Sequence, residues 1–368
     1  MNAIHFLTGA AIVLGHVATA WAQDAQGGKL LGVLLAAGDI AWCKEDGHKA
    51  TAAILRAQMA NATKNNVPVL VLALGDLAYP GGGQAELNCF HSSWGKAVIE
   101  EPAVPVPGND AFKKPENRLL PVPGNHEYRG DRRFFPHFRN RENPWVEQQG
   151  TNTGYFVVNF PHATDGPWRI IGLNSELSGP DMEKQNDWLV ERLNDTKPRC
   201  VLAFWHKPLI SSGEHGHGDC GKACKQPDAP LCRPNESSKA CDRAELKKMK
   251  PAYSRLYERG ASLVLTGHDH HFEQFGRHDA DGKPDEMRGL RAFVVGTGGT
   301  GLYKTDFKNR WKPPLGEVYS HDFKGVLRID LYQDRYTWKF VSTDKEQKPF
   351  SLKVGETVVD HDTCNERR

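Results

Sequence analysis

The sequence predicts an α/β fold built around a parallel sheet. Two nearly continuous apolar runs, at 29–37 and 67–74, are typical of strands buried on both faces. Between them, residues 48–64 carry Ala, Leu, Ile and Met at helical spacing and end at Asn65-Asn66. Strand, helix and strand in this order form a βαβ unit, which favours parallel strands.

The rest of the chain supplies more strands and helices. Short apolar or alternating segments predict strands at 119–123, 155–160, 168–173, 200–205, 261–265, 290–296, 325–332 and 336–341. Helices are expected at 90–99, 182–194 and roughly 244–259. No internal repeat of fixed period and no long linker interrupts this order. We therefore expect residues 23–368 to form a single two-sheet α/β domain.

Composition gives no support for some classes of partner. The chain has 368 residues, of which 39% are hydrophobic and 25% charged, as in an ordinary globular protein. Its net charge of +2 gives no argument for binding nucleic acid or an acidic membrane. No nucleic-acid partner is expected, and the sequence does not determine the oligomeric state.

Residues 1–22 have the features of a signal peptide. The segment is uncharged and largely apolar, and it closes on Ala20-Trp21-Ala22, which fits an A-x-A cleavage site. It lacks the usual Lys or Arg at its start, and an uncleaved membrane anchor is the alternative. His5 and His16 disfavour a spanning helix. We expect cleavage after Ala22, a secreted or periplasmic protein, and no stable membrane anchor.

The eight cysteines indicate disulfides in an oxidising compartment: Cys43, Cys89, Cys200, Cys220, Cys224, Cys232, Cys241 and Cys364. Four of them lie in an insertion at about 213–243 that is rich in Gly, Pro, Lys and Ser. Such a segment has few apolar residues to hold it together, so crosslinks would stabilise it. A small structural zinc site is the alternative, although the spacing fits no familiar CxxC pair. The pairing cannot be read from the sequence.

Five apolar runs end, one after another, in a residue that can bind a metal ion: Asp39, Asp76, Asn125, His206 and His268. The carboxyl ends of strands gather ligand-binding residues at one edge of an open α/β sheet. Singly, each residue has an ordinary explanation as a turn former, a cap or a core histidine. The ordered set is hard to explain by packing. Glycine, which permits close backbone approach, directly precedes four of the five residues.

These motifs resemble those of the calcineurin-like metallophosphoesterases. That family carries an early Asp, then GDxx, GNH[DE], an isolated His after a strand, and GHxH. The chain has Gly38-Asp39, Gly75-Asp76, Gly124-Asn125-His126-Glu127, His206 and Gly267-His268-Asp269-His270. The resemblance implies a four-layer α/β/β/α sandwich of two mixed sheets flanked by helices.

Within that family the chain resembles the purple acid phosphatase branch. Many relatives place a metal-binding His two residues after the first Asp, where this chain has Ala41. The purple branch instead has GDxxY, which Gly75-Asp76-Leu77-Ala78-Tyr79 matches. The resemblance implies two metal ions, one held by Asp39, Asp76, Tyr79 and His270, the other by Asp76, Asn125, His206 and His268.

The donor types agree with this division. Asp76 has two carboxylate oxygens and can bridge both ions. A phenol with an ordinary pKa of about 10 needs a strongly Lewis-acidic ion to bind as phenolate, which favours Fe(III) at the first site. Two His, an Asn and the shared carboxylate suit Zn, Fe(II) or Mn at the second. An ordinary aromatic in a Tyr79-Pro80 turn is the alternative for the tyrosine.

Two such ions, about 3.5–4 Å apart, can lower the pKa of a bound water and clamp both oxygens of an in-line displacement at phosphorus. We therefore expect a phosphomonoesterase in which a metal-bound hydroxide attacks a small phosphorylated substrate directly, without a Ser or Cys nucleophile. The resemblance implies that His126 faces the substrate phosphate and that His215 or His217 helps to protonate the leaving group. A glycine separates that pair here, whereas the family's pair is adjacent.

We favour His215 over His217, and a Gly-rich polar loop is the alternative for both. Asp269 and His271 are expected beside the ligands or at the surface rather than among the ligands. A phosphodiesterase of the same fold, acting on nucleotides or lipid head groups, is the nearest alternative function. A non-catalytic binding protein that keeps the fold is a third, disfavoured because every matched ligand position is filled.

Overall fold

The computed structural model describes residues 28–104, 114–129, 132–139, 147–148, 153–162, 166–213, 215, 248–303, 316–344, 352–353 and 360–368. The predicted signal peptide at 1–22 lies outside these residues. So do His217, the four clustered cysteines and the rest of the 213–243 insertion apart from Gly213 and His215. Those expectations stay predictions, as does the single-domain organisation.

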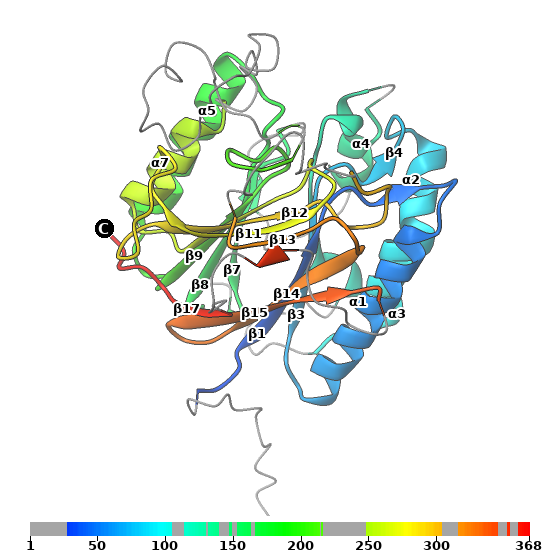
Figure 1. The fold of residues 1–368 in the computed structure, drawn as a ribbon, viewed down its shortest axis with the longest axis horizontal. Helices are drawn as coiled ribbons and strands as arrows, with labels where there is room; N and C mark the ends of the chain where they lie inside the picture. Colours follow the sequence, from blue (N-terminus) through cyan, green and yellow to red (C-terminus); the bar gives the residue numbers. More distant parts are fainter. Residues whose placement is uncertain are drawn as a thin grey trace, which may run out of the picture.

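Two large sheets dominate the described chain (Figure 1). The first has six strands, in the order β17 (His361–Thr363), β15 (Arg335–Ser342), β14 (Gly325–Leu331), β1 (Gly32–Ala37), β3 (Val69–Leu74) and β5 (Leu119–Val122). Strands β1, β3 and β5 are parallel, as the predicted βαβ unit requires. The other three join by antiparallel pairing, so the sheet is mixed.

The second sheet has nine strands, in the order β16 (Leu352–Lys353), β13 (Val318–Ser320), β11 (Phe272–His278), β12 (Leu290–Val295), β10 (Leu263–Thr266), β9 (Cys200–Phe204), β8 (Trp168–Gly172), β7 (Phe156–Phe160) and β6 (Glu147–Gln148). Its central strands β12, β10, β9 and β8 are parallel. Antiparallel strands extend it on both sides.

Helices cover the outer face of each sheet. In Figure 1, α1 (Gly47–Lys64) and α3 (Lys96–Glu100) lie on the right, and α5 (Pro180–Asn194) and α7 (Lys250–Glu258) on the left, with the sheets between them. The predicted four-layer α/β/β/α sandwich is therefore confirmed. Within the described residues, no helix combines the length and apolarity needed to cross a membrane.

Strand β9 shows how one apolar run serves two layers. Alternate residues of a strand point to opposite faces. Leu202 and Phe204 join the core between the two sheets, whereas Val201 and Ala203 join the core beneath α5 and α7. Both faces are buried, which is why the run is continuously apolar rather than alternating.

Most predicted elements are found, with shifted ends. The predicted helix at 90–99 instead continues α2 (Gln84–Phe90) through a π-helical turn, His91–Gly95, into α3. Strand β11 was not predicted, because buried polar residues interrupt its apolar pattern. Gln274 accepts a hydrogen bond from Trp338 Nε1 at 2.9 Å, and Arg277 forms an ion pair with Asp362. Strands β13 and β17 were also missed.

Short elements at the end of the sandwich complete the frame of the site. They are β2 (Ala41–Trp42), β4 (Ala78–Tyr79), α4 (Phe134–Arg139) and the 3-10 turns Pro115–Arg118 and His126–Tyr128. Strands β2 and β4 pair in parallel with each other, outside the two large sheets. This pairing aligns the segment that follows β1 with the segment that follows β3.

Two disulfides confirm the prediction that the chain is crosslinked. Cys43 pairs with Cys89 and joins the turn after β2 to α2. Cys200 pairs with Cys364 and joins the start of β9 to the C-terminal segment. The second disulfide therefore links β9 of the nine-stranded sheet to the residue directly after β17 of the six-stranded sheet.

We expect loss of the Cys200–Cys364 disulfide to destabilise the protein more than loss of the Cys43–Cys89 disulfide. The sequence separations are 164 and 46 residues. In the chain-entropy account, stabilisation grows with the logarithm of loop length, and this difference corresponds to about 1 kcal/mol. Urea unfolding of the two Cys-to-Ser double variants measures it. Equal losses, or a larger loss for the shorter loop, would contradict the account.

Candidate metal centre

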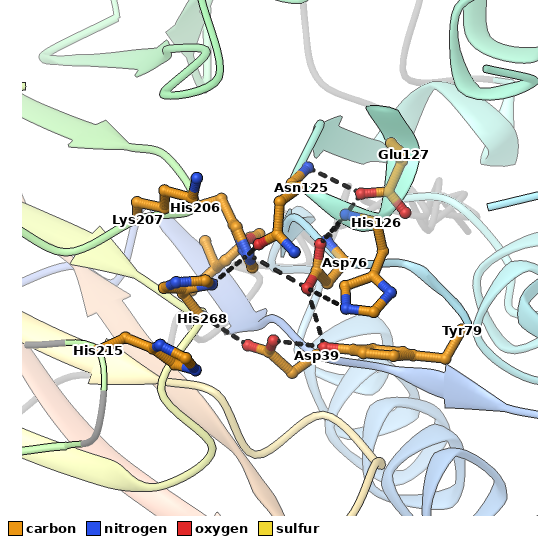
Figure 2. Close-up of polar contacts among 12 residues, drawn as sticks. Asp39, Asp76, Tyr79, Asn125, His126, Glu127, His206, Lys207, His215 and His268 are labelled. Atoms are coloured by element: carbon orange, nitrogen blue, oxygen red, sulfur yellow. Dashed lines mark hydrogen bonds and ion pairs between the residues drawn. The ribbon is translucent and has the colours of Figure 1, made fainter. Parts of the chain in front are cut away.

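Five strands deliver one polar residue each to the same end of the sandwich. Asp39, Asp76, His206 and His268 each lie two residues beyond the end of β1, β3, β9 and β10, and Asn125 lies three residues beyond β5. Figure 2 shows these side chains converging between the two sheets, with Tyr79 entering from β4. The structure thus brings together all seven residues that the sequence nominated as ligands.

One group of donors surrounds the Tyr79 hydroxyl. It lies 2.7 Å from Asp39 Oδ1, 3.0 Å from Asp76 Oδ2 and 3.1 Å from His270 Nε2. His270 Nε2 also lies 3.3 Å from Asp39 Oδ1. These are the four residues assigned to the first ion.

A second group surrounds His206. Its Nε2 lies 3.3 Å from Asp76 Oδ2, 3.2 Å from Asn125 Oδ1 and 3.1 Å from His268 Nδ1. Three potential ligand atoms lie within 4.8 Å of one another, one each from Asp76, His206 and His268. This spacing is close enough for the three residues to share an ion. Asp76 Oδ2 belongs to both groups, in the position that a bridging ligand would take.

Hydrogen bonds from the backbone orient both carboxylates. Asp39 Oδ2 accepts the His268 N–H at 2.7 Å, and Asp76 Oδ1 accepts the His126 N–H at 2.8 Å. The other oxygen of each carboxylate therefore points toward Tyr79. The backbone takes positive φ at Asp39 (60°), Asp76 (49°) and His268 (72°), a conformation that L-residues rarely adopt. Such strain persists where the surrounding structure imposes it, and it is concentrated at functional sites.

Two of the imidazoles are held through their outer nitrogens. His206 Nδ1 lies 2.9 Å from the Leu74 carbonyl, and His270 Nδ1 lies 2.7 Å from the Gly301 carbonyl. A neutral imidazole that donates its Nδ1–H to a carbonyl presents the lone pair of Nε2, which is how proteins orient metal-binding histidines. In both residues Nε2 faces the centre.

Glu127 is a buried carboxylate whose role the sequence analysis did not recognise. It accepts the backbone N–H groups of Asp76 at 2.8 Å, Leu77 at 2.8 Å and Gly124 at 2.7 Å. It therefore ties the loop after β3 to the loop after β5. The sequence held a signal for this role, because Glu127 completes the motif Gly124-Asn125-His126-Glu127. Its side chain is fully buried, which is rare for a glutamate unless it has partners.

The charges of the centre fit cations. Burial, Asp39 and Asp76 raise the pKa of Tyr79 well above its ordinary value, so its phenolate requires a nearby positive charge. Burial opposes the charged form of His206, but Asp76 outweighs it and raises the pKa of His206 to about 10. The single hydrogen of the Tyr79 hydroxyl faces three acceptors within 3.1 Å and can satisfy only one. The donor set is therefore suited to positive ions.

The two described histidines that were predicted to face substrate lie beside the candidate ligands. His126 Nδ1 is 2.6 Å from the Pro80 carbonyl, and its ring centroid is 4.2 Å from that of Tyr79. The His215 ring lies against His268, with 4.4 Å between centroids (Figure 2). They thus adjoin different parts of the centre, His126 near Tyr79 and His215 near His268.

Tyr303 is a further residue that the sequence analysis missed. Its ring stacks on His270, with centroids 4.0 Å apart and planes at 9°, and its hydroxyl lies 3.4 Å from His215 Nε2. It follows the glycine-rich run 296–301, which comes directly after β12. That run packs on the loop that carries Asp39, where Gly298 N–H donates to the Gly38 carbonyl.

Lys207, the residue directly after His206, is held by contacts of its side chain and its backbone. Its Nζ forms an ion pair with Glu176 at 3.0 Å, and both side chains are buried. Its backbone N–H donates to Ser175 Oγ at 3.1 Å. These contacts fix the chain directly after a candidate ligand.

Comparisons with known proteins agree with this geometry. The model of the calcineurin-like phosphoesterase family matches residues 32–272, which contain all seven candidate ligands. The chain matches no curated protein sequence.

Similar solved structures include three with TM-scores of 0.50 or above. GAP50, the anchor in the inner membrane complex of Plasmodium, shares 15% identity over 92% of this chain and 90% of its own, with a TM-score of 0.54. Purple acid phosphatase PPD1 from yellow lupin (Lupinus luteus) seeds shares 14% over 90% and 53%, with 0.51. PhoD shares 12% over 92% and 71%, with 0.50. Such likeness shows the fold alone.

We expect Gly124→Ala to lower metal affinity by about tenfold or more, as loss of a supporting contact typically does. A Cβ at this position would lie 2.5 Å from Asp76 N and 2.8 Å from His206 Cδ2, so both must move apart. Titration of metal-free protein with Zn²⁺ measures the change. Gly81→Ala is the matched control, because no atom lies within 4 Å of its added Cβ. Equal affinity in both variants would contradict the packing argument.

Proposed function

The chain belongs to the calcineurin-like phosphoesterase family, and on this basis we propose that it is a secreted binuclear-metal phosphatase that hydrolyses phosphate monoesters, as purple acid phosphatases do. The observation that carries the proposal is the position of the Tyr79 hydroxyl, 2.7 Å from Asp39 and 3.0 Å from Asp76. A phenol between two carboxylates is an unusual arrangement for a purely structural site, because burial disfavours all three charged forms.

The proposed ligand sets follow the two groups of contacts. Asp39, Asp76, Tyr79 and His270 would hold Fe(III), since a buried phenol with a raised pKa binds as phenolate only to a strongly Lewis-acidic ion. Asp76, Asn125, His206 and His268 would hold Zn, Fe(II) or Mn. Asp76 Oδ2, within 3.3 Å of donors in both groups, supports its assignment as the bridge.

When bound, the two ions would activate a water and stabilise the charge that develops on the phosphoryl oxygens. The chain's own residues would supply the remaining functions. His126, held at its Nδ1 by the Pro80 carbonyl, would orient the phosphate through Nε2. His215 would hold at Nε2 the proton that the leaving oxygen takes up as its bond to phosphorus breaks. No covalent nucleophile is part of the proposal.

Secretion is part of the proposal because of the two disulfides and the expected signal peptide. Disulfides persist in oxidising compartments and are rare in the cytosol. A binding role without catalysis is a second candidate, since GAP50, a structure of the same fold, is described as an anchor. The measurements below separate the two roles.

We expect the purified protein to hydrolyse p-nitrophenyl phosphate faster than bis(p-nitrophenyl) phosphate, and Asp76→Ala to abolish metal loading. Activity should fall by about a thousandfold, the factor that corresponds to about 4 kcal/mol of lost charge stabilisation. The control Asp46→Ala removes an exposed carboxylate that pairs with Lys49, and it should change neither property. Faster turnover of the diester would favour a phosphodiesterase. Full activity in Asp76→Ala would contradict the metal scheme.

The iron assignment predicts a visible charge-transfer band that Tyr79→Phe removes. The reason is that only a phenolate bound to Fe(III) would produce the band. Absorption spectroscopy combined with metal analysis checks this. Tyr257→Phe serves as control, since that hydroxyl donates to Asp285, which is not among the candidate ligands. A colourless protein that contains only divalent ions would refute the Fe(III) assignment and leave the hydrolase proposal standing.

A further inference from the structure

The segment 268–273 presents different side chains in opposite directions. His268 and His270 enter the candidate metal centre, whereas Asp269 and Glu273 meet the described residues of the segment 211–215, which are 211–213 and 215. Asp269 and Glu273 are fully buried. A buried carboxylate is costly unless hydrogen bonds compensate it, so the partners of these two residues are informative.

Most of the donors come from the 211–215 segment. Asp269 accepts the Ser211 hydroxyl at 2.6 Å and the His215 N–H at 2.9 Å. Glu273 accepts the Ser212 N–H at 2.8 Å and the Ser212 hydroxyl at 2.5 Å. Connecting segments are ordinarily the more mobile parts of a fold. Here two carboxylates, one in the loop between β10 and β11 and one in β11, accept the hydrogen bonds of this segment. Hydrogen bonds to charged groups are the stronger kind.

The clamped segment ends at His215. Its ring rests against His268, and its Nε2 lies 3.4 Å from the Tyr303 hydroxyl. The segment 268–273 thus supplies two candidate ligands, His268 and His270. Its other side chains, Asp269 and Glu273, hold the segment that carries His215. These contacts set the position of His215 relative to His268.

We propose that Asp269 and Glu273 are positioning residues that hold the 211–215 segment, so that His215 stands where it can protonate a departing oxygen. The catalytic part of this inference rests on the proposed phosphatase function. The hydrogen bonds of Asp269 and Glu273 to this segment form a clamp whose effect on catalysis is selective. Hydrolysis of esters with poor leaving groups depends on the clamp, and hydrolysis of esters whose leaving groups need no proton does not.

The kinetic test releases the segment from its own side, without touching a ligand. Ser211→Ala/Ser212→Ala should lower kcat about tenfold for phenyl phosphate and less than about twofold for p-nitrophenyl phosphate, whose leaving group is less basic, because only the former needs a proton donor. KM and metal content should stay unchanged. Ser262→Ala is the control, a buried serine whose hydroxyl accepts the Asn365 N–H at 3.1 Å. Equal loss on both esters would overturn the proposal.

A double-mutant cycle with His215→Ala distinguishes positioning from general damage. If the serines act only through His215, their replacement should cause no further loss of phenyl phosphate turnover in the His215→Ala background. Losses that multiply in the combined variant would overturn the positioning role.

A readout that needs neither metal nor substrate separates failure of the clamp from failure of the proposed function. In metal-free protein, Asp269→Ala should accelerate hydrogen exchange at the His215 amide about tenfold or more, because it removes the acceptor of that N–H. Unchanged exchange would overturn the clamp. Accelerated exchange in a protein that cleaves neither ester would confirm the clamp and reject its catalytic use together with the phosphatase proposal.

Discussion

The burial of two carboxylates around one phenol is the constraint on which the site depends. Asp39 and Asp76 have almost no contact with solvent, yet both reach the hydroxyl of Tyr79. Like charges this close repel unless a cation or hydrogen-bond donors compensate them. The backbone N–H groups of His126 and His268 each satisfy one oxygen of the pair and leave the other turned inward. The loops that bring those N–H groups there are therefore as necessary to this arrangement as the candidate ligands themselves.

The apolar cores of the sandwich offset the free-energy cost of gathering these polar groups. Parallel strands from both sheets end at one place, and their apolar bodies fill the cores on either side. The strained backbone at the ends of β1, β3 and β10 costs on the order of 1–3 kcal/mol per residue. That cost is small compared with the hydrophobic free energy gained by burying β1, β3 and β10, in which every residue is buried. A rigid apolar body thus supports a polar end that would not persist alone.

Signals local in sequence were readable, and signals that depend on distant partners were not. Uniform apolar runs predicted β1, β3 and β9, and the residue types at their ends predicted the cluster of candidate ligands. Strand β11 was hidden because Glu273 and Arg277 look exposed until their partners Ser212 and Asp362 are placed beside them. The stacking of Tyr303 on His270 was unreadable for the same reason. The disulfide pairing also required the fold, since it joins segments 46 and 164 residues apart.

The left-handed backbone at Asp39, Asp76 and His268 also limits how this protein can evolve. Residues branched at Cβ are strongly disfavoured at positive φ, whereas Asn, Asp, His and Gly tolerate it. The backbone conformation thus restricts which residue types can occupy these three positions, whether or not an ion binds there. The backbone at Tyr79 and Asn125 has no positive φ and imposes no such restriction. Among the candidate ligands, variation between relatives is therefore expected at positions such as these two before it is expected at Asp39, Asp76 or His268.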